Sequence, residues 1–573
     1  MIKGLINWFQ RTRDYIFPQN NQVQIQAKED IEAKKPLIKT NKTYYIDPTV
    51  PTFLLTQNMP SATALPLRGV GEGGGGFALG TAQQQADGLK QMVNDALVYM
   101  KSKCPVAITK WRATSTLTLH PRAGQDLNAY YDRSSLRFFY FPDNILKKRI
   151  YAADSRTVVT HEFGHAFLDI LRPDFWSAQA SEVWAYHEAF GDITAFLNNL
   201  QYDPLIQMAL DETSGDLSKS NHLTRLAAEM GVGLHHYANG SYGELENCLR
   251  DMSIVFNYVI PETLPKDGLD TVLINESHSF SRVFSSMFYR LFVAIANDNV
   301  INRMAPIAAI KSARDTLASY LIQATIKAPL TPRLFKAICQ EMLVVDQKNK
   351  SKYQKIMTNI FVTSKIMPVT VKLLKEVKIE SILKNITSDY TLEDDGDLKI
   401  IRVSMVKTMK ISQKMGVLAL NSNPLLDKEI ETASQSAYYF DKDGNMIDAN
   451  EASQSEIINA AYECLDIINK KNMASGDDKA IFEVVDDKIV RKQIVCTCNK
   501  PNYCIPGAPE YQKPWKPKNN SGCIACKSTC EPKSCDCEQP EPPAPPKIGC
   551  FTTINKQGAT SYKFGQTISR KVC

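Results

Sequence analysis

Apolar residues recur at helical spacing over several long segments of the chain and alternate with polar residues over others. In residues 82–101 the helical spacing places an apolar stripe on one face, which predicts a long helix that faces the core. The stripe consists of Leu89, Met92, Val93, Ala96, Leu97 and Met100. Residues 106–141 alternate and are rich in β-branched and aromatic side chains, so they predict a small sheet.

From residue 157 to residue 342 the pattern is mostly helical. We therefore expect an α+β fold in which a sheet-containing lobe precedes a helical lobe. After residue 342 lysine-rich helical runs are followed by strand-like segments, and Asp443-Gly444 predicts a hairpin turn between two of these. A calcium loop is not favoured there, because the twelve-residue ligand spacing is not met.

These changes of pattern divide the chain into an N-terminal extension, a main domain, an accessory helical and strand region of α/β character, and a cysteine-rich tail that contains prolines. The four regions are residues 1–60, 61–342, 343–495 and 496–573.

Composition narrows the function classes. The 573 residues are 44% hydrophobic and 22% charged, and the net charge of +6 is not gathered into an arginine-aromatic cluster, so nucleic-acid binding is not predicted. No window of about 18 apolar residues predicts a transmembrane segment. Residues 1–20 lack the apolar core of a secretory signal, so we expect a cytoplasmic protein or one exported by a non-classical route.

Cysteines are concentrated at one end of the chain. Ten of the 14 cysteines follow residue 495, in a segment with little apolar content. Disulfides could staple such a segment, and this is the interpretation we favour, although it conflicts with the lack of a secretory signal. The alternative is a structural zinc site that includes Cys523 and Cys526, whose spacings match no standard zinc finger. In either case the tail is expected to mediate protein or surface interactions.

Candidate chemistry lies in residues 157–171, TVVTHEFGHAFLDIL. His161 and His165 are four residues apart on a predicted helix, so both imidazoles can reach one tetrahedral cation. Glu162 follows the first histidine and can act as a general base on a water bound to that cation. This spacing predicts a catalytic zinc site on a helix that ends at Arg172-Pro173.

A catalytic zinc needs a third protein ligand while one position stays open for water. A metzincin continuation would require glycine and histidine where the chain has Leu168 and Leu171, which excludes that class. A later helical segment, HEAFGD, supplies Glu188, with Asp192 one turn further on.

HEFGH followed after 22 intervening residues by EAFGD resembles the paired helices of thermolysin-like gluzincin zinc metallopeptidases, and is most similar to bacterial gluzincin-like proteins. The resemblance implies a two-lobed zincin fold that binds one catalytic Zn²⁺. By this resemblance Glu188 is the third zinc ligand. Asp192 would then accept a hydrogen bond from the distal nitrogen of His161 and fix its tautomer.

Two further segments are similar to the same family. LNAYYDRSSLRFFYF resembles the substrate-binding edge strand, whose counterparts Asn128 and Ala129 would bind the peptide backbone by strand addition. ESHSFSRVFSSMFYRLF resembles the helix start whose histidine polarises the scissile carbonyl, which nominates His278 as a catalytic residue. The alternative is that His278 has a purely structural role in capping the helix, beside Ser277 and Ser279.

The resemblance implies a peptidase that acts on a peptide or protein substrate. In its mechanism Glu162 would take a proton from a zinc-bound water and return it to the leaving amine.

 

The family's calcium sites cannot be placed on this sequence, although the resemblance keeps Ca²⁺ as a candidate cofactor. The family's second carbonyl-binding tyrosine cannot be placed either, and Tyr186 and Tyr237 are only weak candidates for it. The competing class is a non-catalytic binding or scaffold protein that has a structural metal site and uses its cysteine-rich tail for interactions. A structural site usually lacks an open position and a neighbouring base, so Glu162 favours the metalloendopeptidase.

Overall fold

The computed structural model describes most of the chain between residues 65 and 460. The described ranges are 65–70, 80–126, 128–143, 146–178, 180–237, 248–265, 271–368, 377–404, 429–453 and 455–460, together with short strands elsewhere. The side chain of Tyr237 and the predicted disulfide or zinc chemistry of the tail lie outside the described residues.

A four-stranded mixed sheet forms the first part of the fold. Its order is β3 (Leu67–Gly69), β4 (Leu117–His120), β6 (Ser135–Phe138) and β5 (Ala129–Tyr131). The first three strands run parallel, and β5 runs antiparallel to β6 at the edge. A separate hairpin, β7 (Tyr140–Asp143) and β8 (Lys148–Tyr151), follows. The sheet predicted for residues 106–141 is therefore present.

Helix α2 (Ala82–Ser102) packs on β3, β4 and α3. It begins at Thr81, whose side chain accepts a hydrogen bond from the backbone N–H of Gln84 and so satisfies one of the amides at the helix start. All six residues of the predicted apolar stripe are at most 1% exposed. The predicted core-facing helix is confirmed.

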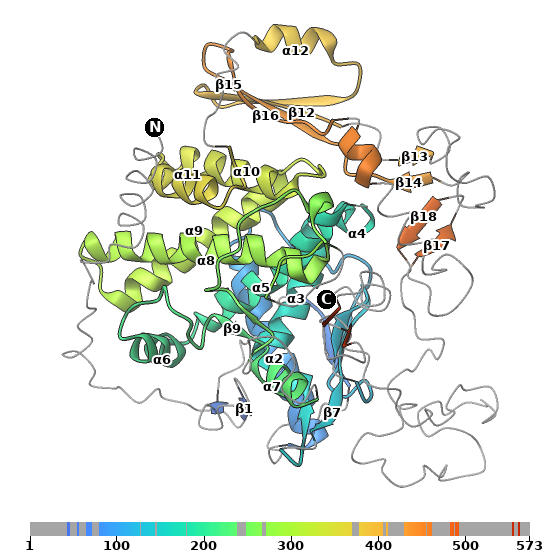
Figure 1. Cartoon of the computed structure of the whole chain (residues 1–573), viewed down its shortest axis with the longest axis vertical. Helices are drawn as coiled ribbons and strands as arrows, with labels where there is room; N and C mark the ends of the chain where they lie inside the picture. The colour runs from blue at the N-terminus through green and yellow to red at the C-terminus, as the bar shows by residue number, and fades with distance from the viewer. Residues whose placement is uncertain are drawn as a thin grey trace.

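Nearly all of the remaining core is helical (Figure 1). The helices are α3 (Arg156–Leu171), α4 (Asp174–Ser177), α5 (Ser181–Asn199), α6 (Asp203–Thr213), α7 (Ala228–Tyr237), α8 (Ser277–Ile301), α9 (Pro306–Lys327), α10 (Leu334–Lys348) and α11 (Gln354–Thr363). Helix α5 lies between α3 and α8, and α9 packs on both α8 and α10. The α+β class is confirmed, and α3 ends before Pro173 as predicted.

The boundary that we expected after residue 342 falls inside α10. Met342 and Val345, on either side of it, belong to the same apolar core, which continues through α11 to Met367. The helical core therefore extends about one and a half helices beyond the predicted boundary, because α11 packs on α8.

A second sheet follows this core and is antiparallel throughout. Its order is β11 (Tyr390–Asp394), β12 (Leu398–Val403), β15 (Ser436–Asp441) and β16 (Met446–Asn450). One face contacts Val344 of α10, and the other is covered by α12 (Ile379–Asn385), seen at the top of Figure 1. The predicted hairpin turn at Asp443-Gly444 is confirmed, since it joins β15 to β16 and Gly444 has φ +74°.

The other short elements complete the description. They are β1 (Thr43–Tyr45), β2 (Leu54–Thr56), β9 (Arg225–Leu226), β10 (Arg250–Asp251), β13 (Thr408–Lys410), β14 (Glu429–Glu431), β17 (Phe482–Val485), β18 (Lys488–Arg491), β19 (Thr553–Ile554) and β20 (Thr560–Ser561). Within the described ranges, none of the helices combines the length and the apolar character that crossing a membrane requires.

Candidate metal site

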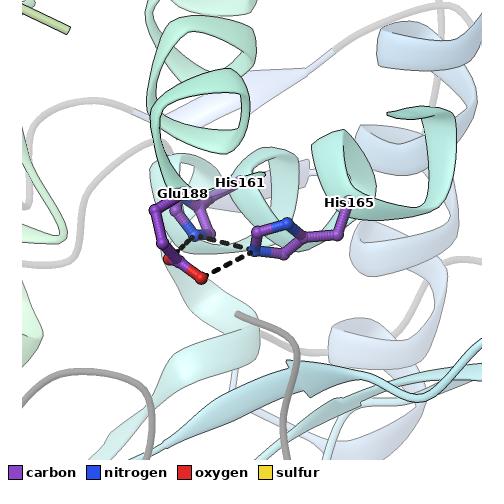
Figure 2. A group of neighbouring side chains, drawn as sticks. All are labelled: His161, His165 and Glu188. Atoms are coloured by element: carbon purple, nitrogen blue, oxygen red, sulfur yellow. Dashed lines mark hydrogen bonds and ion pairs between the residues drawn. The ribbon is translucent and has the colours of Figure 1, made fainter. Parts of the chain in front are cut away.

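Two adjacent helices bring the predicted metal ligands together. His161 and His165 project from α3 and Glu188 projects from α5, and all three side chains are buried. Their ligand atoms lie within 4.8 Å of one another, and Figure 2 shows the three side chains converging on one point. This buried group could hold a metal ion.

The spacing of the ligand atoms fits a tetrahedral ion. Bonds of about 2.0–2.1 Å to a tetrahedral zinc place neighbouring ligand atoms roughly 3.3 Å apart. The Nε2 atoms of His161 and His165 are 3.2 Å apart, and His161 Nε2 is 3.4 Å from Glu188 Oε2. The third edge, from His165 Nε2 to Glu188 Oε1, is 3.9 Å. Two of the three edges therefore match without movement of the helices.

Two glycines permit this approach of α3 to α5. A Cβ atom added at Gly164 would lie 2.8 Å from the Cα of Gly191, whereas a Cβ at Gly191 would lie 2.8 Å from Cε1 and Nδ1 of His161. Carbon atoms in favourable contact are about 3.5–4.0 Å apart. Any larger residue at either position would push the helices or the His161 ring away, so the two glycines set the distance on which the metal geometry depends.

Burial sets the charge state of the three ligands. It lowers the pKa of His161 and of His165, because the imidazolium form loses its hydration. It also raises the pKa of Glu188 well above its ordinary value, although Arg250 opposes this effect. The site therefore offers two neutral imidazoles and one carboxylate whose ionised form is unfavourable without a nearby cation. A bound metal ion would stabilise this set of ligands.

Asp192, the predicted partner of His161, lies beside that ring. The Nδ1 of His161 lies 3.0 Å from Asp192 Oδ1, which leaves Nε2 directed at the other two ligands. Burial alone would raise the pKa of Asp192, but Arg250 and His161 together hold it below its ordinary value. The Nη2 of Arg250 donates to Asp192 Oδ1 over 2.7 Å, and its Nε donates to the same carboxylate. Arg250 lies on the short strand β10.

Glu162 lies on α3 between the two histidines and is fully buried. Its negative charge is one of the causes, after burial, that raise the pKa of Glu188. A general base at this position would act on a group bound at the metal site.

His278 lies at the first turn of α8, and its Nε2 is 3.3 Å from Glu188 Oε2. Its Nδ1 is 2.6 Å from Glu276 Oε1. The other oxygen of Glu276 accepts the backbone N–H groups of His278 and Ser279, so Glu276 is the residue that caps the helix. The fold therefore brings His278 to the metal site and assigns the capping role to its neighbour.

The predicted substrate-binding residues lie at the edge of the first sheet. Ala129 is the first residue of the edge strand β5, and Asn128 precedes it. The side chain of Asn128 is fully buried, and its amide donates to Asp126 Oδ2 over 3.2 Å. Tyr186, a weak candidate for carbonyl binding, is fully buried within the helices, where its hydroxyl is 2.6 Å from Thr325 Oγ1.

Sequence reasoning missed four residues of the site: Gly164, Gly191, Arg250 and Glu276. Gly164, Gly191 and Glu276 lie inside HEFGH, EAFGD and ESHSF, so the motifs could have drawn attention to them. For the two glycines the signal is that a glycine in each of two paired helices indicates close packing. Arg250 carries no local signal, because it is a single arginine 58 residues beyond its partner Asp192.

No protein-family model and no curated protein matches the chain. The case for a function therefore depends on the geometry of this site.

Proposed function

We propose that the protein is a zinc-dependent peptidase of thermolysin-like gluzincin architecture, with its active site between the sheet-containing lobe and the helical lobe. The observation that carries the proposal is the near-tetrahedral spacing of His161, His165 and Glu188 in a buried site that also contains Glu162 and His278. Two nitrogen ligands and one carboxylate oxygen are a donor set typical of catalytic zinc in metallopeptidases.

A zinc ion bound there would polarise a substrate carbonyl and lower the pKa of a bound water to about 7. Glu162 would take the proton of the attacking water and return it to the leaving amine. The backbone of β5 would pair with an extended peptide, with contacts from Asn128 and Ala129.

His278 would stabilise the negative oxygen that develops during attack. Its Nδ1 lies 2.6 Å from Glu276 Oε1, which fixes the orientation of the ring. The Nε2 atom is thereby held beside the ligands, 3.3 Å from Glu188 Oε2.

The test compares the wild type with Glu162→Gln and with Glu380→Gln, a control at an exposed position on α12. All three proteins are loaded with zinc to equal content and incubated with a mixed peptide library, and cleavage products are identified by mass spectrometry. We expect Glu162→Gln to lose about 10²–10⁴-fold of the activity with zinc retained, while the control keeps it.

Equal inactivity of zinc-loaded wild type and Glu162→Gln across the library would contradict the proposal. That result would favour the scaffold protein with a structural metal site.

A further inference from the structure

A small cavity lies far along α8 from the metal site. It has a volume of about 180 Å³ and is lined by Ser218, Ser253, Val255, Tyr289, Arg290 and Val293. Arg290 is twelve residues beyond His278 on the same helix, which separates the two by roughly 18 Å at 1.5 Å per residue. The cavity is therefore distinct from the metal ligands.

Arg290 has an incomplete set of partners. Its Nη2 donates to Ser364 Oγ, but its Nε is buried without a hydrogen-bond acceptor in the described part of the chain. Burial alone lowers its pKa to about 10, with no contribution from a neighbouring charge. The guanidinium remains a cation at neutral pH, and a half-buried cation without a counter-charge loses hydration without compensation.

Other arginines of this protein show the usual arrangement. Arg250 pairs with Asp192, Arg333 with Glu182 and Arg402 with Glu341. Among the described residues no carboxylate lies within ion-pair distance of Arg290. Within the described residues Arg290 therefore lacks the ion pair that the other three arginines have.

The remaining polar groups of the lining are already engaged. Ser218 Oγ donates to Asp216, Ser253 Oγ donates to Asp251, and the Tyr289 hydroxyl donates to the carbonyl of Leu217. Arg290 is thus the donor that a ligand would meet. Asp216 and Asp251 place negative charge beside these serines and Tyr289, so an anion that meets Arg290 must be small enough to stay clear of the two carboxylates.

We propose that this cavity binds a small oxyanion, of the phosphate or simple carboxylate class, through the guanidinium of Arg290. The cavity volume suits an ion of a few heavy atoms and is below the size of ordinary cofactor pockets, which begin at about 300 Å³. A planar guanidinium recognises phosphate and carboxylate oxygens through paired hydrogen bonds. The proposal stands independently of the peptidase function.

The test measures thermal unfolding of the full chain while phosphate, or acetate in a parallel series, replaces chloride at constant ionic strength. Arg290→Gln removes the cation, and Arg290→Lys keeps the charge but loses the planar fork. Arg303→Gln is the matched control, because Arg303 is exposed, follows the same helix and undergoes the same charge change. Isothermal titration with the same two anions gives the affinities.

We expect at least one anion to raise the Tm of the wild type and of Arg303→Gln, with an affinity at least tenfold weaker for Arg290→Gln and intermediate for Arg290→Lys. The series that responds tells phosphate from carboxylate. In chloride alone Arg290→Gln should unfold no earlier than the wild type, because it removes an uncompensated charge. The proposal is overturned if neither anion acts beyond chloride, or if Arg290→Gln responds as strongly as the wild type.

Discussion

The close crossing of α3 and α5 makes Gly191→Ala a sharp test of the metal site. The added Cβ would lie 2.8 Å from the His161 ring, whereas carbon contacts are favourable at about 3.5–4.0 Å, so the ring must move by at least about 0.7 Å. Metal–ligand distances tolerate changes of about 0.2 Å. We therefore expect zinc affinity to fall by at least tenfold, or about 1.4 kcal/mol.

The same substitution has a smaller effect on the free energy of unfolding without metal. Alanine is favoured over glycine inside a helix by about 0.8–1.0 kcal/mol, whereas overpacking costs about 1–3 kcal/mol. These contributions leave a net destabilisation of about 0–2 kcal/mol. Gly164→Ala is the informative comparison. Its Cβ would lie closest to the backbone of Gly191, at 2.8 Å from the Cα, and would also meet the side chain of Thr194, so it should cost more stability.

Zinc affinity is measured by competition with a chromophoric chelator, and stability by urea unfolding of the chelated protein. A folded Gly191→Ala variant that binds zinc as tightly as the wild type would refute the reasoning, because it would mean that His161 does not need its observed position.

Three further predictions concern the groups around the ligands. Arg250→Gln leaves the buried carboxylate of Asp192 without its cation, so we expect a loss of about 3–5 kcal/mol in urea unfolding, and an unchanged stability would contradict the pairing. The pKa of Glu276 is held below its ordinary value, although burial would raise it, because His278 and the helix amides favour the carboxylate. The stability that the Glu276 carboxylate contributes is present above its pKa in the unfolded chain and is lost as pH falls through its lower pKa in the folded chain. The difference in stability between wild type and Glu276→Gln should therefore narrow in melting curves at acid pH. A difference that stays constant with pH would contradict this role of Glu276. Removal of metal by a chelator should lower the Tm, and re-addition of zinc at 100 times its Kd should restore about 2.7 kcal/mol, whereas a Tm indifferent to both treatments would count against metal binding.

The sequence predicted the site well where local spacing determines geometry. Two histidines four residues apart must share a helical face, and the resemblance of HEFGH and EAFGD to paired gluzincin helices implied a second helix that brings Glu188 and Asp192 to them. Arg250 could not be found by the same reasoning. Arg250 lies on a two-residue strand, and no periodic pattern in the sequence predicts that it contacts Asp192.

Fold predictions were limited in the same way. The apolar stripe of α2 and the hairpin turn at Gly444 are local patterns, and both are confirmed. The end of the helical core was misplaced because lysine-rich composition marks the solvent face of a helix as readily as it marks a new domain. Only the packing of α11 on α8 shows that the core continues.

Helix α10 has a practical consequence for any attempt to isolate the part of the protein that carries the candidate metal site. Its Met342 packs with the helices around the metal ligands, while its Val344 packs with Leu398 and Ile400 of the second sheet. Glu341 of the same helix pairs with Arg402 through two hydrogen bonds. A fragment that ends at residue 342 would lose the second half of α10 and α11, so it would expose the apolar core residues that they cover. It would also leave Glu341 without Arg402 as its cation. Expression trials should therefore keep the chain through residue 460.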